Sequence, residues 1–329
     1  MRIIPFLVAL VISFIIPSAL FGDYHFSFAT GAGFLSGVSD EIVYQNTVDD
    51  TVLSRLSWAM KPLYYVSVTL NYAPVDPFKR VDVFLDLSCK FGFEGMTGAM
   101  EDRDWQDYDD STALTNYSVH DNYTKNAFLF DGDAGFLLPL GSRYLFKVFG
   151  SFSYMTFSWN ARNGYLQYAK TTNGFYDTSM YPWSASLPKK YLYGPVISYS
   201  QQWISAASGL SFSMPFLQVF TVELGLKIGT VLYCAGVDDH YLRQLQFNDF
   251  SSGGILVEPK LLLSFSKNKH LAVLFSTSYR SIQGTQGVTY YRQTGYQQNA
   301  AAGTIFKSSG GSGASFAVAD TGFILTLSF

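Results

Sequence analysis

The chain has 329 residues, of which 17% are aromatic and only 14% charged, and its formal net charge is −3. This balance provides no basic surface for nucleic acid, so a nucleic-acid-binding function is excluded. It is also unusual for a secreted soluble domain of this size and favours a protein that exposes aromatic side chains to lipid.

The N-terminus has the pattern of an export signal. Arg2 precedes an apolar run over residues 3–20 that contains no acid and ends in small residues at 19–22. We predict that residues 1–22 form a cleaved signal peptide, with a retained membrane helix as the alternative. No later apolar run is long enough for a membrane helix. Residues 23–329 are therefore expected to form one domain, either soluble and secreted or a β-barrel in the outer membrane of a diderm bacterium.

Alternation with period two is the main signal of the remaining chain. Over residues 81–93 every second residue is apolar, whereas the positions between them include Asp86 and Lys90. The same division recurs over residues 126–136 and 222–234. Strands with an apolar outer face and a polar inner face are typical of outer-membrane β-barrels.

Two further details agree with a barrel. The alternation over residues 323–329 ends in a terminal phenylalanine, which resembles the recognition signal of outer-membrane barrels. Cys89 and Cys234 both follow the apolar rows, so we expect both thiols to face lipid on distant strands. Thiols placed in this way cannot form a disulfide.

The breaks between alternating segments give a strand count. Nine connections predict ten antiparallel strands, with the short turns in the periplasm and the long loops outside. Strands of about 20 residues, at ~3.3 Å per residue, exceed the ~25 Å apolar band and are expected to extend above the membrane. The short breaks are at 74–79, 139–143, 214–217 and 266–270, and the long ones at 45–53, 96–122, 165–188, 236–243 and 285–312.

Two pairs of polar residues stand out near the long loops. Asp102 and Asp104 are two positions apart, as are Asp238 and His240, so each pair shares one face of an extended strand. Strands three and eight lie opposite each other in a ring of ten, so the pairs can face one site. Asp238 would orient His240 as a general base, and the crowded aspartates would include one with a raised pKa. The expected reaction is hydrolysis of a peptide bond by an activated water.

The same residues also allow other functions. The two pairs could be ordinary loop residues, or could hold a hard or weakly bound metal ion, although we expect no metal. Ser118 near His120 is the only pairing that suits a lipase, and we expect it to have a supporting role. A barrel without catalysis that acts as an adhesin or host-protein-binding surface is the main alternative, and a narrow pore is a third.

The strand-end motifs also occur in one known family. The segments concerned are Leu35-Ser36-Gly37 with Glu41, Val43 and Tyr44; Leu56-Ser57-Trp58; Asp102-Arg103-Asp104-Trp105; His120; Ala161-Arg162 with Gly164; and Asp238-Asp239-His240-Tyr241. Together they resemble the omptin family of outer-membrane endoproteases. The resemblance implies a ten-stranded barrel in which an Asp-Asp pair and an Asp-His pair flank a catalytic water at the extracellular mouth.

The resemblance also implies how substrates and lipids are bound. Glu41 matches a glutamate of the family's pocket for a basic residue, whereas Gly236 replaces the aspartate beside it and Asn116 replaces an acid of the neighbouring subsite. We therefore expect cleavage next to basic residues with relaxed specificity. Residues 152–156 carry no charge at the family's lipopolysaccharide site, so we expect no lipopolysaccharide cofactor.

The expected partners follow from charge and location. Seven carboxylates against one arginine over residues 101–121 should attract cationic peptide or protein substrates from outside the cell. We further expect contact with outer-membrane lipid, and a monomer.

Overall fold

The computed structural model describes residues 24–46, 51–74, 76–217, 219–268, 271–295 and 302–328. The proposed signal peptide and the terminal Phe329 lie outside these residues. The strands are β1 (Tyr24–Tyr44), β2 (Val52–Pro74), β3 (Asp82–Gly92), β4 (Gly95–Asp104), β5 (Asn116–Leu140), β6 (Tyr144–Tyr168), β7 (Thr171–Thr172), β8 (Phe175–Tyr176), β9 (Lys190–Tyr191), β10 (Pro195–Leu217), β11 (Phe220–His240), β12 (Leu245–Asn268), β13 (Leu271–Gln293) and β14 (Ile305–Ser328).

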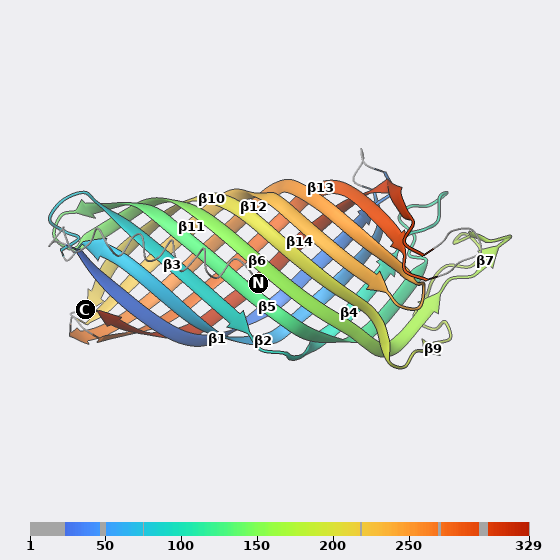
Figure 1. Ribbon diagram of the computed structural model, residues 1–329, viewed down its shortest axis with the longest axis horizontal. Coiled ribbons are helices and arrows are strands. Elements are labelled where there is room, and N and C mark those ends of the chain that lie inside the picture. The colour runs from blue at the N-terminus through green and yellow to red at the C-terminus, as the bar shows by residue number, and fades with distance from the viewer. Residues whose placement is uncertain are drawn as a thin grey trace.

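The long strands form one antiparallel sheet that closes on itself (Figure 1). Pairing runs from β5 through β4, β2, β1, β14, β13, β12, β11 and β10 to β6, and β6 pairs again with β5. The predicted third strand is interrupted after Gly92. Its two parts, β3 and β4, each pair with β2 on one side and with β5 on the other. The all-β antiparallel prediction is confirmed, although the elements are more numerous than the ten predicted strands.

The connections between strands divide between the two ends of the sheet. Short turns gather at the end where the C-terminus lies, and long loops gather at the other end, near β7 and β9 (Figure 1). Several predicted loops were too wide, among them 96–122, 236–243 and 285–312, because the strands continue into them. Since β4 ends at Asp104 and β11 at His240, both candidate pairs lie on strands and not in loops.

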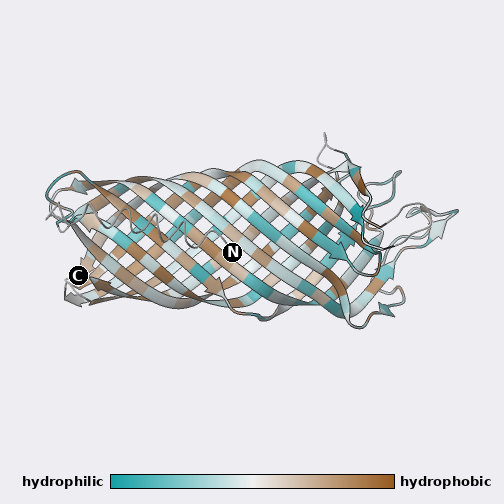
Figure 2. Ribbon diagram, viewed as in Figure 1, coloured by the Kyte–Doolittle hydropathy of each residue, from teal (hydrophilic) through white to brown (hydrophobic). Residues whose placement is uncertain are grey.

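Hydrophobic residues are frequent along the strands towards the turn end, whereas hydrophilic residues gather at the loop end (Figure 2). Phe91 is 47% exposed on the outer face, whereas its neighbour Lys90 lies inside and pairs with Asp320. The predicted division into apolar outer and polar inner faces is therefore confirmed in this half. Within the described residues no helix is long and apolar enough to cross a membrane.

Irregular pairing in the middle of several strands reverses which residues point inward. On β11, Ile228 and Leu232 are each 54% exposed, whereas Cys234 and Asp238 are almost fully buried. The reversal occurs at Leu232, which has no partner on β10 because Val231 and Tyr233 pair with consecutive residues there. Such a β-bulge shifts the alternation by one residue. The prediction that Cys234 faces lipid is therefore wrong.

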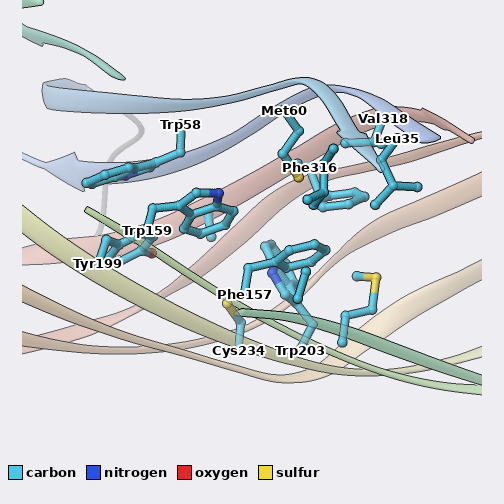
Figure 3. Close-up of a cluster of buried hydrophobic side chains, with 14 of the residues drawn as sticks. Leu35, Trp58, Met60, Phe157, Trp159, Tyr199, Trp203, Cys234, Phe316 and Val318 are labelled. Carbon is cyan, nitrogen blue, oxygen red and sulfur yellow. The ribbon is translucent and has the colours of Figure 1, made fainter. Parts of the chain in front are cut away.

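The two cysteines nevertheless remain unpaired, as expected. Cys89 is partly exposed, and Cys234 is buried within the core; both thiols are free. Figure 3 shows Cys234 among the aromatic side chains of the interior.

An aromatic cluster fills the middle of the interior (Figure 3). Trp58 stacks on Trp159 and Tyr199, with ring centroids 5.8 and 5.3 Å apart, and Phe157 stacks on Trp159 at 5.3 Å. Offset aromatic pairs of this kind contribute about 0.5–1.5 kcal/mol each beyond the area they bury. The cluster separates the interior of the turn end from that of the loop end.

The interior of the turn end is a polar cavity of about 350 Å³. Five of the six acids that line it form ion pairs with basic residues from other strands. The ion pairs are Lys90–Asp320, Lys147–Glu223, Lys227–Asp133, Arg280–Asp131 and Arg280–Glu258.

Candidate active site

The first candidate pair lies at the end of β4. Asp102 is flanked by Leu56 on β2 and Ser118 on β5, and its Oδ1 lies 3.4 Å from the hydroxyl of Ser54. Asp104 is only 5% exposed, and its Oδ2 accepts a hydrogen bond from Asn116 Nδ2 at 3.0 Å. Both carboxyls therefore point into the interior, as the i, i+2 spacing predicted.

Burial and mutual repulsion oppose ionisation of this pair. The pKa of Asp102 is raised well above its usual value, first by burial and then by the charge of Asp104. Burial also raises the pKa of Asp104, although the hydrogen bond from Asn116 counteracts it. Two carboxyls in this situation readily hold one proton between them, as expected from the sequence.

The second pair lies at the end of β11. His240 Nε2 and Asp238 Oδ2 are 2.6 Å apart. Because an ionised carboxylate can only accept, the imidazole donates this hydrogen bond from its Nε2–H group. The Asp238 side chain is 1% exposed and that of His240 13%. Donation from Nε2 leaves Nδ1 of the neutral ring as a proton acceptor. The Asp-His dyad therefore has the arrangement of a general base held by a carboxylate.

The two pairs face each other across the interior. In the closed sheet β4 and β11 are four strands apart in one direction and six in the other, so they are nearly opposite. The charge of Asp238 adds to the raised pKa of Asp102, and that of His240 acts on Asp104. These mutual effects mean that four candidate residues from two distant segments share one electrostatic site at the loop end.

Glu41 reaches the same site from β1. It is 2% exposed, and burial together with the charges of Asp238 and Asp249 raises its pKa well above the usual value. Asp102 contributes to the same effect. Glu41, which the sequence predicts to bind substrate, is thus close enough to feel the charge of one member of each pair.

Ser118 and His120 lie beside the site and contact each other. His120 Nε2 is 3.0 Å from Ser118 Oγ, and His120 Nδ1 is 2.5 Å from the carbonyl oxygen of Asn163. Burial lowers the pKa of His120, which favours the neutral ring. The Nδ1 atom of His120 contacts a backbone carbonyl of β6 and not a carboxylate. This arrangement suits a supporting role for Ser118 and His120.

Two residues of the site were missed in the sequence. Asp249 on β12 is 6% exposed and lies directly across from Gly236. Arg243, in the turn after β11, lies close enough to lower the pKa of both Asp102 and Asp104. Neither belongs to a motif. Asp249 could have been suspected only as an acid in an otherwise alternating strand.

These features define a class of protein: an antiparallel sheet that closes on itself and holds, at one mouth, two opposed pairs of residues that each include a carboxylate. The chain belongs to the Omptin family, whose sequence model matches residues 23–323. No curated protein matches the chain.

One solved structure is similar along nearly its whole length. The outer membrane protease OmpT from Escherichia coli has a TM-score of 0.75 at 18% identity, covering 93% of this chain and 97% of that one. OprG from Pseudomonas aeruginosa has a TM-score of 0.33 at 9% identity, covering 93% and 98%. The toluene transporter TodX from Pseudomonas putida has 0.30 at 8%, covering 92% and 89%. The likeness to OmpT supports the fold.

Proposed function

We propose that the protein is an outer-membrane endopeptidase that hydrolyses peptide bonds with a water held between Asp102–Asp104 and Asp238–His240. The observation that carries this proposal is the opposition of a hydrogen-bonded Asp-His dyad to a crowded pair of aspartates inside one mouth of the closed sheet. Membership of the Omptin family supports the same reaction.

Each residue has a role in the proposed step. Nδ1 of His240 takes a proton from the water while the water oxygen forms a bond to the carbonyl carbon of the substrate. Asp238 stabilises the resulting imidazolium through Nε2. The protonated member of the Asp102–Asp104 pair donates to the carbonyl oxygen as negative charge develops there. His240 then returns its proton to the leaving amine, the C–N bond breaks, and the acid and amine products separate.

The proposed setting is a β-barrel of ten strands, counting β3 and β4 as one, that follows a signal peptide at residues 1–22. The strand segments between the short turns and the bulges would cross the outer membrane, since their outer side chains are apolar. The loop end and the active site would then face the exterior, where a monomer would meet cationic peptide substrates. The uncharged residues 152–156 support activity without lipopolysaccharide.

A second function is favoured by the loops themselves. Tyr108, Phe175 and Tyr193 are 77%, 70% and 86% exposed at the loop end, which suits contact with another protein. The alternative is thus an adhesin that retains the site without using it. Cleavage of a basic fluorogenic peptide by the refolded protein separates the two: turnover that is lost in His240→Ala supports the endopeptidase, and binding without turnover in several lipids supports the adhesin.

A further inference from the structure

Asn116 lies directly against one member of the proposed catalytic pair of aspartates. It is the first residue of β5 and stands opposite Asp104, the last residue of β4, so the two side chains lie side by side on the inner face of the closed sheet. Asn116 is 3% exposed, and its Nδ2 donates to Asp104 Oδ2 over 3.0 Å. One carboxyl of the pair thus has a buried amide as its hydrogen-bond donor.

The orientation of this amide follows from its surroundings. Asn116 Nδ2 also lies 3.5 Å from Gln106 Oε1, so the amino group faces two oxygen acceptors. If the amide were turned over, its oxygen would face the Asp104 carboxylate with no proton between them. In the present orientation Asn116 Oδ1 is buried and has no hydrogen-bond partner among the described residues. A buried acceptor without a partner costs free energy, so the bond to Asp104 is what decides how the amide lies.

The backbone around Asn116 is held from several sides. Thr115 is fully buried, and its N–H and its hydroxyl both donate to the Asp104 carbonyl oxygen at 2.9 Å. Ala169, which follows β6, donates its N–H to the Thr115 carbonyl oxygen at 2.8 Å, and the Gln106 N–H donates to Thr115 Oγ1 at 3.1 Å. The ends of β4, β5 and β6 therefore keep the amide and the carboxyl in register.

The donor beside Asp102 is weaker. Ser54 Oγ lies 3.4 Å from Asp102 Oδ1, which is long for a hydrogen bond between two oxygen atoms. A hydrogen bond to an ionised carboxylate is stronger than one to a neutral carboxyl, so the carboxyl with the better donor ionises first. When the pair holds one proton, this geometry favours a carboxylate at Asp104 and an acid at Asp102.

The groups that face Asp104 from other strands also favour its ionised form. Burial raises the pKa of Asp104, whereas its hydrogen bonds and then the positive charges of Arg243 and His240 lower it. Tyr168 on β6 pairs with Asn116, and burial raises the pKa of its phenol, so this neighbour is neutral. These surroundings are compatible with a carboxylate at Asp104.

Asp102 instead has acids of other strands near it. Burial, then the charge of Asp104 and to a smaller extent that of Asp238 raise the pKa of Asp102, although Arg243 opposes them. Glu41 on β1 is a further acid nearby, since the charge of Asp102 adds to the effect of burial in raising the pKa of Glu41. These charges disfavour a carboxylate at Asp102 and agree with a proton on this residue.

We propose that Asn116 is a positioning residue that holds Asp104 as the ionised member of the pair, so that the shared proton resides on Asp102. The proposal rests on the endopeptidase function proposed above. In that reaction Asp102 donates this proton to the carbonyl oxygen as the water attacks, and takes it back when the C–N bond breaks. Asn116 acts only through Asp104 and touches neither the water nor the cleaved bond.

Asn116→Leu tests the proposal, because leucine has the branched shape of asparagine but no donor. Without the donor, the pair should release the first of its two protons at a pH about one unit higher. The acid limb of the pH profile of kcat/KM should shift upward by the same amount for an arginine peptide. We expect kcat to fall roughly 10-fold with KM within about twofold. A residue that only lines the neighbouring subsite would raise KM and leave the acid limb in place.

Asn122 provides a matched control on the same strand. Its side chain is fully buried on the same inner face, and its Nδ2 donates to the Ala59 carbonyl oxygen at 2.8 Å, away from the pair. Asn122→Leu should therefore leave the acid limb unchanged. Because leucine is larger than asparagine, Asn116→Ala is the second variant and should shift the limb in the same direction as Asn116→Leu. An acid limb that stays in place in the folded Asn116 variants, or that moves equally in Asn122→Leu, would overturn the proposal.

An infrared titration keeps the two proposals separate. In the His240→Ala background no imidazole titrates beside the pair, and the C=O absorption of protonated carboxyls shows at which pH the pair takes up its second proton. Adding Asn116→Leu should move this uptake upward by about one pH unit. If the parent cleaves no peptide, the endopeptidase proposal fails, and the titration still decides the role of Asn116. Proton uptake at the same pH with and without the amide would refute that role whether or not cleavage occurs.

Discussion

Val231 and Cys234 both point into the closed sheet although they are three positions apart on one strand, and each is 2% exposed. Regular alternation would place them on opposite faces. The unpaired Leu232 between them resets the alternation, and Asp238 and His240 follow Cys234 on the inner face. The orientation of the proposed general base thus depends on the bulge, which takes one residue out of the alternation.

Deletion of Leu232 should leave the end of β11 in its present orientation, because it removes the extra residue and gives an unbroken alternation in which Val231, Cys234 and Asp238 still point inward. We expect peptide cleavage to be retained and Cys234 to stay unreactive from outside. Thiol labelling in a Cys89→Ala background measures the second effect, with the undeleted Cys89→Ala protein as the control. A folded deletion variant in which Cys234 becomes reactive and cleavage is lost would show that Leu232 is not the residue taken out of the alternation.

Substitution of one residue in either proposed catalytic pair should strongly reduce turnover without unfolding the protein. His240→Ala and Asp102→Asn should each lower kcat/KM about 10²–10⁴-fold, the usual contribution of a general acid or base. Steady-state cleavage of an arginine peptide measures the loss, and Asp40→Asn serves as the folded control with one carboxylate fewer. Comparable rates in His240→Ala and the parent would leave the adhesin as the better proposal.

The stability of the protein should depend on pH through Asp249. Its pKa is raised to about 6, first by burial and then by the charge of Asp238, with Glu41 and Thr289 as its hydrogen-bonding neighbours. A carboxyl whose pKa is higher in the folded state favours folding below about pH 4, and that contribution is lost as the pH rises through about 6. Two pKa units correspond to about 3 kcal/mol.

Asp249→Asn should therefore be more stable than the parent at pH 8, by up to about 3 kcal/mol, and the difference should shrink towards pH 4. Denaturant unfolding in detergent across this range measures it. The raised pKa of Glu41 changes stability with pH in the same direction. The measurement therefore compares the stabilities of the variant and the parent at each pH and does not rely on the pH curve of either protein alone. A difference that grows towards acid would contradict the assigned direction.

Activity should not require lipopolysaccharide. Residues 152–156 place Phe152 on the outer face, 45% exposed, and bury Ser153 and Met155, so this stretch offers no charge to a lipid phosphate. We expect cleavage rates within about twofold with and without lipopolysaccharide added to the refolded protein, since charge-assisted contacts dominate phosphate binding. Strict dependence on added lipopolysaccharide would refute this expectation.

Much of the fold was predictable because alternation is a local property of the sequence. The apolar outer rows and the short turns gave an all-β antiparallel protein. The i, i+2 spacing of Asp102 and Asp104 placed both on one face. The lengths of the loops were not predictable, since strands such as β11 continue through polar sequence when a neighbouring strand supplies their hydrogen bonds.

The sequence by itself determined which residues belong to the proposed chemistry, because Asp102, Asp104, Asp238 and His240 occur in recognisable motifs. Only the tertiary structure decided that Cys234 is buried and that Asp249 joins Glu41. Both outcomes depend on where a strand bulges and which residues stand opposite each other on neighbouring strands. Register of this kind arises from pairing between distant segments, so no local pattern records it.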